Sequence, residues 1–316
     1  MSDSESSTKR SDLAYPMYSR PPTLTERLAL LLGFTLGFCP VCGQFVRISD
    51  WFDNFRETGF CANCGSSNRR RQIAYVLCGS LSGWRGSILR SIPKTLARMN
   101  LLIYNTEASG SLHSYLSQIP GYVCSEYLGS DHASGELVDG IRHEDLTKLS
   151  FPDSTLDVVV SSDVLEHVTL PYQAHHEIFR VLKPGGRHIF TAPFLQTMYN
   201  DQVFAEPTPN GETKLLKTPI YHLDPRCPHG VLVYTYFSLE MVSKLGAIGF
   251  RTNMYRLYHP ALGILGNNGI VFEAMKPRHG LVQWSENQKD LEKHDEEIDN
   301  LREFAIKRST SNIQEI

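Results

Sequence analysis

Short apolar runs recur through the middle of the chain, and polar segments with a helical spacing of apolar residues separate them. Short apolar runs bounded by polar segments are typical of strands buried on both faces of a sheet. The runs are LLIYN (101–105), YVCSEY (122–127), LDVVVSS (156–162) and RHIFTA (187–192). Because strands and helices alternate, right-handed crossovers are expected. The pattern therefore predicts an α/β fold with a doubly wound, mostly parallel sheet.

Two helices are predicted around the later runs. Pro171 suits the first turn of one helix, and the sequence KPGG (183–186) ends it. The apolar stripe of that helix consists of Ala174, Ile178 and Leu182. The segment SLEMVSKLGAIGF (238–250) predicts the other helix. Its expected inward residues are Leu239, Val242 and Leu245.

A further helix is predicted near the N-terminus. Thr23 suits its N-cap, and the helix is expected to extend through Phe34. Four leucines fall near one face and are expected to pack against the module that follows: Leu24, Leu28, Leu31 and Leu32.

Composition divides the chain into four parts. Residues 1–22 are polar and rich in serine, so we expect them to be disordered. Residues 23–90 form a small cysteine-rich module with flanking helices, and residues 91–278 form the α/β domain. The composition of residues 279–316 predicts a charged tail that is helical or disordered. Its apolar residues span two heptads, which are too few to establish a coiled coil or an oligomer.

Charge and hydropathy exclude several classes of protein. The 316 residues carry 31 Lys and Arg against 34 Asp and Glu, a net charge of −3, so a polybasic nucleic-acid binder is excluded. The longest apolar stretch, Leu28–Phe38, has eleven residues, whereas a membrane helix needs roughly 20. The first twenty residues lack the apolar segment of a signal peptide. We therefore expect a cytoplasmic protein without a membrane partner.

Four cysteines occur in two closely similar motifs. CPVCG (39–43) and CANCG (61–65) are separated by an 18-residue spacer. Two such knuckles can place the thiolates of Cys39, Cys42, Cys61 and Cys64 around one Zn²⁺ ion, with no coordination position left for a substrate. A redox dithiol is the alternative, but it needs only one of the two motifs. The motif therefore predicts a structural zinc ion in a zinc-ribbon-like module.

Candidate binding residues, most of them polar, follow the predicted strands at the sheet edge where open α/β sheets bind ligands. They are Thr106, Glu107 and Gly110 after the first run, Glu126 after the second, Asp145 and Leu146 in a later segment, and Ser162, Asp163, Glu166 and His167 after LDVVVSS. Glu126 is placed to accept two ribose hydroxyls, and Asp145 to accept an exocyclic amine. Taken singly, each of these acids is also explained as a helix cap or a turn residue.

The segments DLTKLSFPDSTLDVVVSSDVLEHV (145–168) and EIFRVLKPGGRHIFTAPF (177–194) resemble the second half of class I S-adenosylmethionine-dependent methyltransferase domains of the type 11 kind. The resemblance covers roughly Asn100–Lys276. Six further motifs resemble those of a bacterial subgroup with an N-terminal zinc-ribbon-like module. They are CPVCG (39–43), FRETGFCANCGSSNRRR (55–71), YNTEASGSL (104–112), CSEYLGS (124–130), IRHEDL (141–146) and YHLDPRCPHG (221–230).

The resemblance implies a role for each strand-end residue. Thr106, Glu107 and Gly110 would line the methionine end of S-adenosylmethionine, Glu126 its ribose, and Asp145 with Leu146 its adenine. Ser162 and Asp163 would lie beneath the cofactor, and Glu166 and His167 at the mouth of the substrate pocket. The first motif departs from the family because Tyr104 replaces its acidic residue and Gly110 is its one remaining glycine, so Glu107 would have to bind the cofactor ammonium.

Methyl transfer to an oxygen or nitrogen needs an aligned nucleophile and often a base. Among the candidate bases His143, His167 and His222, we assign catalysis to His167 because it follows a strand end. No second metal site is expected, since the histidines form neither HxH nor HExxH.

Two further segments are candidates to contact the substrate. The composition of residues 193–230 predicts an irregular substrate lid. Arg69, Arg70 and Arg71 are candidates to bind a substrate anion, although a solvated helix face is the favoured interpretation.

These features favour a methyltransferase acting on a small molecule or a glycan precursor. An RNA methyltransferase guided by the zinc module is the first alternative, and nucleic acid is disfavoured because the basic cluster is small and has few aromatic residues nearby. The second alternative is a non-catalytic, zinc-stabilised interaction module that keeps the fold without the cofactor.

Overall fold

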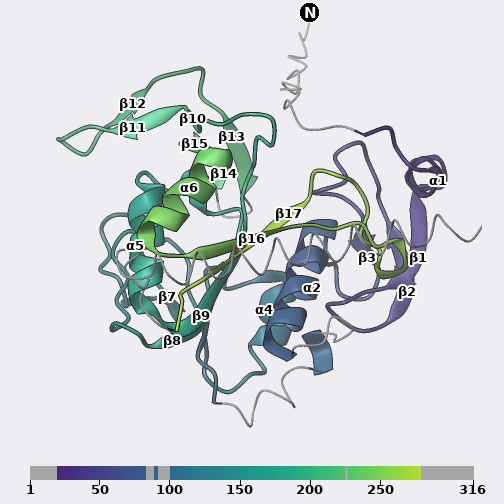
Figure 1. Ribbon diagram of the computed structural model, residues 1–316, viewed down its shortest axis with the longest axis horizontal. Helices are drawn as coiled ribbons and strands as arrows, with labels where there is room; N and C mark the ends of the chain where they lie inside the picture. The colour runs from purple at the N-terminus through teal and green to yellow at the C-terminus, as the bar shows by residue number, and fades with distance from the viewer. Residues whose placement is uncertain (1–19, 83–88, 92–99, 225–226, 279–316) are drawn as a thin grey trace, which may run out of the picture. The chain divides into compact units, whose positions relative to one another are not determined.

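The computed structural model describes residues 20–82, 89–91, 100–224 and 227–278 (Figure 1). Contacts group Met1–Pro277 into one unit, and Arg278–Ile316 form a second unit. The predicted disorder of residues 1–22 and the predicted tail at 279–316 therefore lie largely or entirely outside the described residues.

A six-stranded sheet forms the centre of the first unit (Figure 1). Its strand order is β16-β17-β9-β8-β4-β5. The first four strands along the chain pair in parallel, and β16 and β17 pair antiparallel at one edge. The strands are β4 (Ile103–Asn105), β5 (Tyr122–Cys124), β8 (Leu156–Ser162), β9 (Leu182–Thr191), β16 (Arg251–Arg256) and β17 (Ile270–Met275). All four apolar runs are strands, which confirms the predicted doubly wound, mostly parallel architecture.

Alternate residues of β8 point into two separate cores. Val159 lies in the core that holds α5 (Pro171–Val181) and α6 (Leu239–Ile248). Val158 and Val160 lie in the core that holds α2 (Asn68–Ser82) and α4 (Gly110–Leu116). Figure 1 shows the two helix pairs on opposite sides of the sheet. A strand buried on both faces needs apolar residues at every position, which explains the continuous run.

The helices after β8 agree with their sequence signals, with two exceptions. Pro171 occupies the first turn of α5, and Ala174 and Ile178 are buried. Leu182 was expected in the stripe of this helix, but α5 ends at Val181, and Leu182 begins β9 together with the KPGG sequence. In α6, Leu245 is buried and Val242 packs against the same core. Leu239 was expected to point inward, but it is 42% exposed and Met241 takes its place in the core.

The N-terminal module contains α1 and a three-stranded antiparallel sheet. Its elements are α1 (Leu24–Leu32), β1 (Phe34–Phe38), β2 (Phe45–Ser49) and β3 (Phe60–Cys61). Thr23 caps α1 as predicted and forms a reciprocal capping box with Glu26. The helix does not extend through Phe34 as predicted, because Gly33 takes a left-handed conformation that ends it and Phe34 begins β1.

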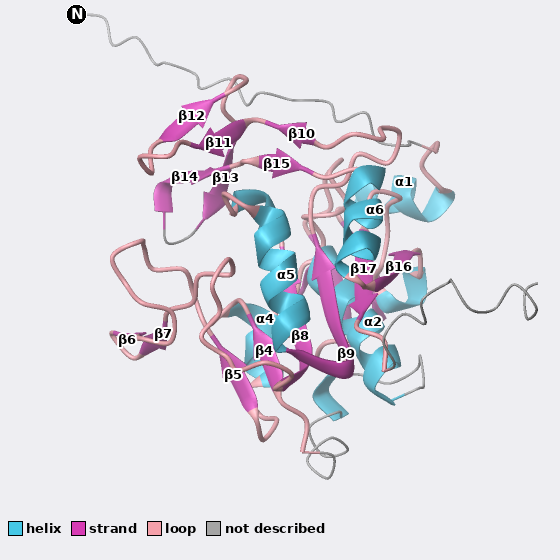
Figure 2. Cartoon of the chain, turned by 60° about the vertical axis from the view of Figure 1, so that its left-hand side comes forward, coloured by secondary structure: helices cyan, strands magenta, loops and turns pink. Residues whose placement is uncertain are grey.

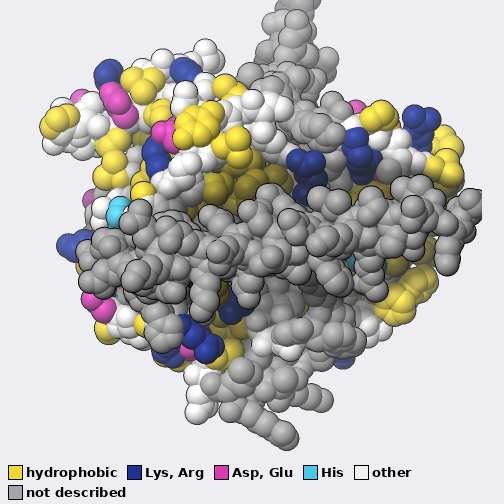
Figure 3. All heavy atoms as spheres, viewed as in Figure 1, with side chains coloured by type: hydrophobic (Ala, Val, Ile, Leu, Met, Phe, Trp, Pro, Cys, Tyr) yellow, Lys and Arg dark blue, Asp and Glu magenta, His cyan; other side chains and the backbone are white. Residues whose placement is uncertain are grey.

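The leucine face of α1 does not pack as predicted. Leu24 and Leu31 are 73% and 79% exposed, and Leu28 and Leu32 are also exposed. Ala29 is the apolar residue of α1 that is fully buried, in a small cluster with Ile48 and Trp51. Figure 3 shows hydrophobic side chains at the surface over α1 and the β1–β2 pair. The short Ala29 side chain lets the helix backbone lie close to this cluster, so the leucines remain outside.

Residues 193–230 contain short strands, so the prediction of an irregular lid is wrong in its local structure. The elements from this segment to α6 are β10 (Gln202–Val203), β11 (Ala205–Pro207), β12 (Thr213–Leu215), β13 (Tyr221–Asp224), β14 (Cys227–Leu232) and β15 (Thr235–Tyr236). They pair as β10 with β15, β11 with β12, and β13 with β14. Figure 2 shows them grouped beyond the carboxyl end of β9.

The remaining short elements are β6 (Leu137–Val138), β7 (Ile141–Arg142) and the 3₁₀ turns η1 (Leu89–Ser91), η2 (Leu165–His167) and η3 (Pro260–Leu262). An isolated parallel bridge between Glu126 and His143 continues the sheet beyond β5. In the part of the chain that the structure describes, no helix has the length and apolar character needed to cross a membrane.

Candidate active site and cysteine cluster

A pocket of about 570 Å³ opens where β4 and β8 end. Three parts of the chain contribute its walls: the N-terminal module with the start of α2, the strand-end loops, and the β13–β14 pair. The lining residues include Arg56, Glu57, Arg69 and Arg70 from the first part, Glu107, Ser162, Asp163 and His167 from the second, and Tyr221, His222 and Val231 from the third. Ligands of open α/β sheets bind at this edge.

The arginines of the pocket bind the strand-end acids. Arg56 forms a two-pronged ion pair with Asp163, and Arg70 pairs with Glu107. Arg69 donates to Ser162 Oγ at 2.7 Å, and its Nε lies 3.4 Å from Asp163 Oδ2. The solvated helix face predicted for residues 69–71 is therefore wrong, because α2 turns this basic segment towards the carboxyl end of the sheet.

Charge and burial compete at Asp163. Burial alone would raise the pKa of this carboxyl group, but the charges of Arg56 and Arg69 outweigh burial and hold the pKa well below its usual value. Burial would likewise lower the pKa of the Arg56 guanidinium, but Asp163 and Glu57 raise it. Both groups are consequently ionised at neutral pH, and Asp163 is already paired with cations.

The loop after β4 retains unpaired polar atoms. Thr106 Oγ1, Glu107 Oε2 and Arg70 Nε are buried and have no hydrogen-bond partner among the described residues. Gly110 has a φ of +81°, and a Cβ atom there would lie 2.9 Å from Arg70 Nη2. Only glycine therefore allows the loop and the guanidinium to lie this close.

Tyr104 takes the place of the family's acidic residue without entering the pocket. Its side chain is fully buried in the core, and its hydroxyl lies 2.7 Å from Ser125 Oγ. Burial raises the pKa of this phenol, so the group is neutral. Glu107 is consequently the acid that this loop offers to the pocket.

The residues predicted to bind ribose and adenine lie outside the lining of this pocket. Glu126 accepts the Ala108 backbone N–H at 2.9 Å, so its carboxylate contacts the loop after β4. Asp145 Oδ1 accepts the N–H and hydroxyl of Thr147, each at 2.8 Å. Leu146 is 6% exposed and packs in the core near Tyr104.

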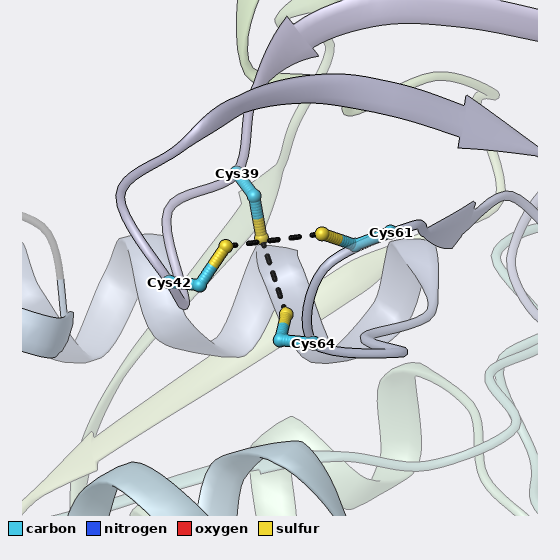
Figure 4. Close-up of side chains that lie close together, drawn as sticks. All are labelled: Cys39, Cys42, Cys61 and Cys64. Carbon is cyan, nitrogen blue, oxygen red and sulfur yellow. Dashed lines mark hydrogen bonds between the residues drawn. The ribbon is translucent and has the colours of Figure 1, made fainter.

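The four predicted cysteine ligands converge from two loops of the N-terminal module (Figure 4). The Sγ atoms are 3.7 Å apart for Cys39 and Cys64 and 3.8 Å apart for Cys42 and Cys61. In each knuckle the glycine N–H donates to the carbonyl of the first cysteine, at 2.7 Å for Gly43 and 2.8 Å for Gly65. Both glycines have a positive φ, which these tight turns require.

Arg71 holds the second knuckle against the rest of the unit. The side chain is fully buried and donates to the carbonyls of Gly59, Ser66 and Gly263, at distances of 2.5 to 3.1 Å. Burial lowers its pKa to about 10, so the guanidinium is still charged at neutral pH. Of the three consecutive arginines, this one is structural.

Comparison with known families gives one match, to the family described as "Methyltransferase domain", over residues 113–190. The matched residues run from α4 to β9 and include Ser162, Asp163 and His167 of the pocket lining, whereas Glu107 precedes them. Residues 113–190 therefore match a methyltransferase domain, and the strands β5, β8 and β9 found there belong to the mostly parallel sheet described above.

The curated proteins that match part of this chain come from Mycobacterium and Mycolicibacterium species. A Mycolicibacterium smegmatis protein named a probable S-adenosylmethionine-dependent methyltransferase is 45% identical over 53 residues, which are 17% of this chain and 21% of the relative. An uncharacterized methyltransferase of Mycobacterium leprae is 50% identical over 38 residues, 12% of this chain and 14% of the relative. The chain therefore matches only a small part of the length of these relatives.

Solved structures give weaker likenesses. An S-adenosylmethionine-dependent methyltransferase from Mesorhizobium loti aligns with a TM-score of 0.35 and 16% identity, over 58% of this chain and 95% of that one. A Haloferax volcanii complex of the Trm112 methyltransferase activator with a methyltransferase aligns with a TM-score of 0.36 and 14% identity, over 65% and 96%. The assignment of the methyltransferase domain rests on the family match and the strand order instead.

Beside the methyltransferase domain's Asp163, the structure brings Glu166, His167 and His222 together. His143, another candidate base, is buried and uses Nδ1 to accept the Leu128 N–H at 3.0 Å. Sequence reasoning missed two features of this site: the entry of Arg56 into the pocket and the meeting of Glu166 with two histidines. Arg56 is 107 residues from Asp163, so no local pattern signals their contact.

Proposed function

We propose that the chain is an S-adenosylmethionine-dependent methyltransferase that modifies a small molecule or a glycan precursor. The observation that carries this proposal is the pocket at the strand ends of the methyltransferase domain, which combines unpaired buried acid and guanidinium atoms. The amino acid end of the cofactor carries one ammonium and one carboxylate. Glu107 Oε2 complements the ammonium, and Arg70 Nε complements the carboxylate.

The remaining cofactor contacts are proposed from the family resemblance. Thr106 and Gly110 bind the methionine end together with Glu107, and Glu126 binds the ribose. Asp145 and Leu146 bind the adenine. Ser162 and Asp163 support the cofactor from below, where their contacts with Arg69 keep them in place.

We further propose that the cysteine cluster holds a structural zinc ion. Tetrahedral Zn–S bonds of about 2.3 Å place sulfur atoms roughly 3.8 Å apart, close to the separations between the paired sulfurs. With four protein ligands the ion has no free position, so its role is to hold the two knuckles and, through them, Arg56 and Arg69 at the pocket.

A small acceptor fits the charges of the pocket better than RNA does. Arg56, Arg69 and Arg70 each pair with a carboxylate of this chain, so they do not form an exposed basic track for phosphates. His167 and His222 both line the pocket, and we assign the catalytic role to His167 because it follows the end of β8. It would accept the acceptor's proton or orient its nucleophilic atom.

Calorimetric titration of the zinc-loaded full chain with S-adenosylhomocysteine tests the proposal. We expect binding in the micromolar range. Glu126→Ala should weaken it by about 1–3 kcal/mol, because the ribose loses charge-assisted hydrogen bonds. Glu212→Ala is the matched control, since Glu212 is exposed on the β11–β12 turn. A folded protein that binds no S-adenosylhomocysteine would instead be the non-catalytic module.

A further inference from the structure

We propose that Glu166, His167 and His222 bind a divalent first-row metal ion at the edge of the pocket, separate from the cysteine cluster. Glu166 and His167 lie in η2, and His222 lies in β13. Glu166 Oε1 is 3.8 Å from His167 Nε2 and 3.6 Å from His222 Nδ1. Metal–ligand bonds of about 2.1 Å place tetrahedral ligand atoms roughly 3.4 Å apart, so small side-chain rotations suffice to bind an ion.

The burial of Glu166 argues for a cation between these groups. Its side chain is fully buried, and neither carboxylate oxygen has a hydrogen-bond partner among the residues that the structure describes. Burying a carboxylate without compensation costs several kcal/mol. Arg56 is the nearby fixed cation, but Asp163 and Glu57 already pair with it.

Both histidines are oriented as metal ligands usually are. His167 Nδ1 lies 2.9 Å from the Leu232 carbonyl oxygen, so Nδ1–H donates and Nε2 keeps its lone pair. His222 Nε2 lies 3.3 Å from the Tyr236 hydroxyl, which leaves Nδ1 directed at Glu166. Hydrogen bonds from the second ring nitrogen fix the tautomer of metal-binding histidines in this way.

An ion pair between Glu166 and a protonated histidine is the simpler alternative. Both separations exceed a normal N–H···O hydrogen bond, which reaches about 3.2 Å. A direct pair would close one of the gaps, whereas the structure holds both histidines at similar distances from the same oxygen. This convergence on one point is typical of a bound ion.

The site also indicates a class of acceptor, an inference that rests on the proposed function. Three protein ligands leave one position free in a tetrahedral site and up to three when the ion expands to octahedral coordination. Two adjacent hydroxyl groups of an acceptor can occupy them, and the ion then favours loss of a hydroxyl proton to water. Of the two roles proposed for His167, the metal site selects the second: through the ion it would orient the nucleophilic oxygen. The acceptor would then be a vicinal diol or a catechol.

Manganese is the probe that separates this site from the cysteine cluster, because thiolates prefer softer ions such as zinc. The experiment titrates Mn²⁺ into the full chain loaded with one equivalent of zinc and follows free Mn²⁺ by electron paramagnetic resonance. We expect one bound Mn²⁺ per chain. Glu166→Gln and His222→Ala should each weaken binding at least tenfold, and His229→Ala, an exposed histidine of β14, should not change it.

Because Glu166 is buried, Glu166→Gln can also disturb folding, and the half-exposed His222 provides the safer variant. Absence of bound Mn²⁺, or equal binding by His222→Ala and the parent protein, overturns the inference. Titration with S-adenosylhomocysteine is a separate readout. Binding of S-adenosylhomocysteine without Mn²⁺ rejects the metal site alone, and binding of Mn²⁺ without S-adenosylhomocysteine rejects the proposed function alone.

Discussion

At the scale of single residues, the histidines of this chain show how environment separates similar side chains. His167 and His222 line the pocket with a free nitrogen each, whereas His175 and His188 are fully buried between α5 and β9. His188 Nε2 lies 2.8 Å from Ser161 Oγ, but neither nitrogen of His175 has a hydrogen-bond partner among the described residues. Burial therefore lowers the pKa of both buried imidazoles.

His175 should make the stability of the protein depend on pH. Burial lowers its pKa to about 3, below the value of 6.5 for an unperturbed histidine. Below pH 6.5 the unfolded chain binds a proton at this histidine that the folded chain does not bind. The free energy of unfolding therefore decreases as the pH is lowered, by up to about 1.4 kcal/mol per pH unit. His175→Leu should flatten this dependence, measured as melting temperature between pH 7.5 and 5. The exposed His176→Leu is the control, and an equal flattening there would contradict the assignment.

At the scale of elements, sequence pattern was a good guide where an element is buried on a long apolar surface. The four runs became strands and α5 has its predicted face, because the sheet accepts apolar residues from both sides. The pattern failed for α1, whose partner surface is the small cluster around Trp51. When the neighbouring core is as small as the cluster around Trp51, the apolar stripe of a short helix does not determine which face the helix buries.

The two faces of α1 should respond differently to substitution. Leu31 is 79% exposed, so Leu31→Gln should change the free energy of unfolding by no more than about 0.5 kcal/mol. Ala29 is fully buried, so Ala29→Gln should destabilise by about 1–3 kcal/mol through overpacking. Urea denaturation followed by circular dichroism measures both. A larger loss for Leu31→Gln would mean that α1 packs by its leucine face after all.

At the scale of the whole molecule, the N-terminal module forms part of the pocket at the strand ends rather than a separate attachment. Cys39, Cys42 and Cys61 share one core with Ile103 of β4 and Val158 of β8. The cysteine spacing predicted the cluster because its geometry is local. The contacts of Arg56 and Arg70 with the strand-end acids were not predictable, since they depend on how the β2–β3 loop and α2 pack against the sheet.

This shared core determines what loss of the proposed zinc ion should do. Cys61→Ser should expose both the knuckles and the sheet residues packed on them, so hydrogen exchange should accelerate in residues 100–105 and 156–162 as well as in 39–65. Binding of S-adenosylhomocysteine should weaken in parallel, because Arg69 and Arg70 leave the pocket. Cys227→Ser is the control, as Cys227 lies outside the cluster. If exchange accelerated only within 39–65 and binding persisted, the module would be an independent unit and the arginines would not belong to the site. Coupled loss would instead mean that zinc indirectly holds the cofactor site together.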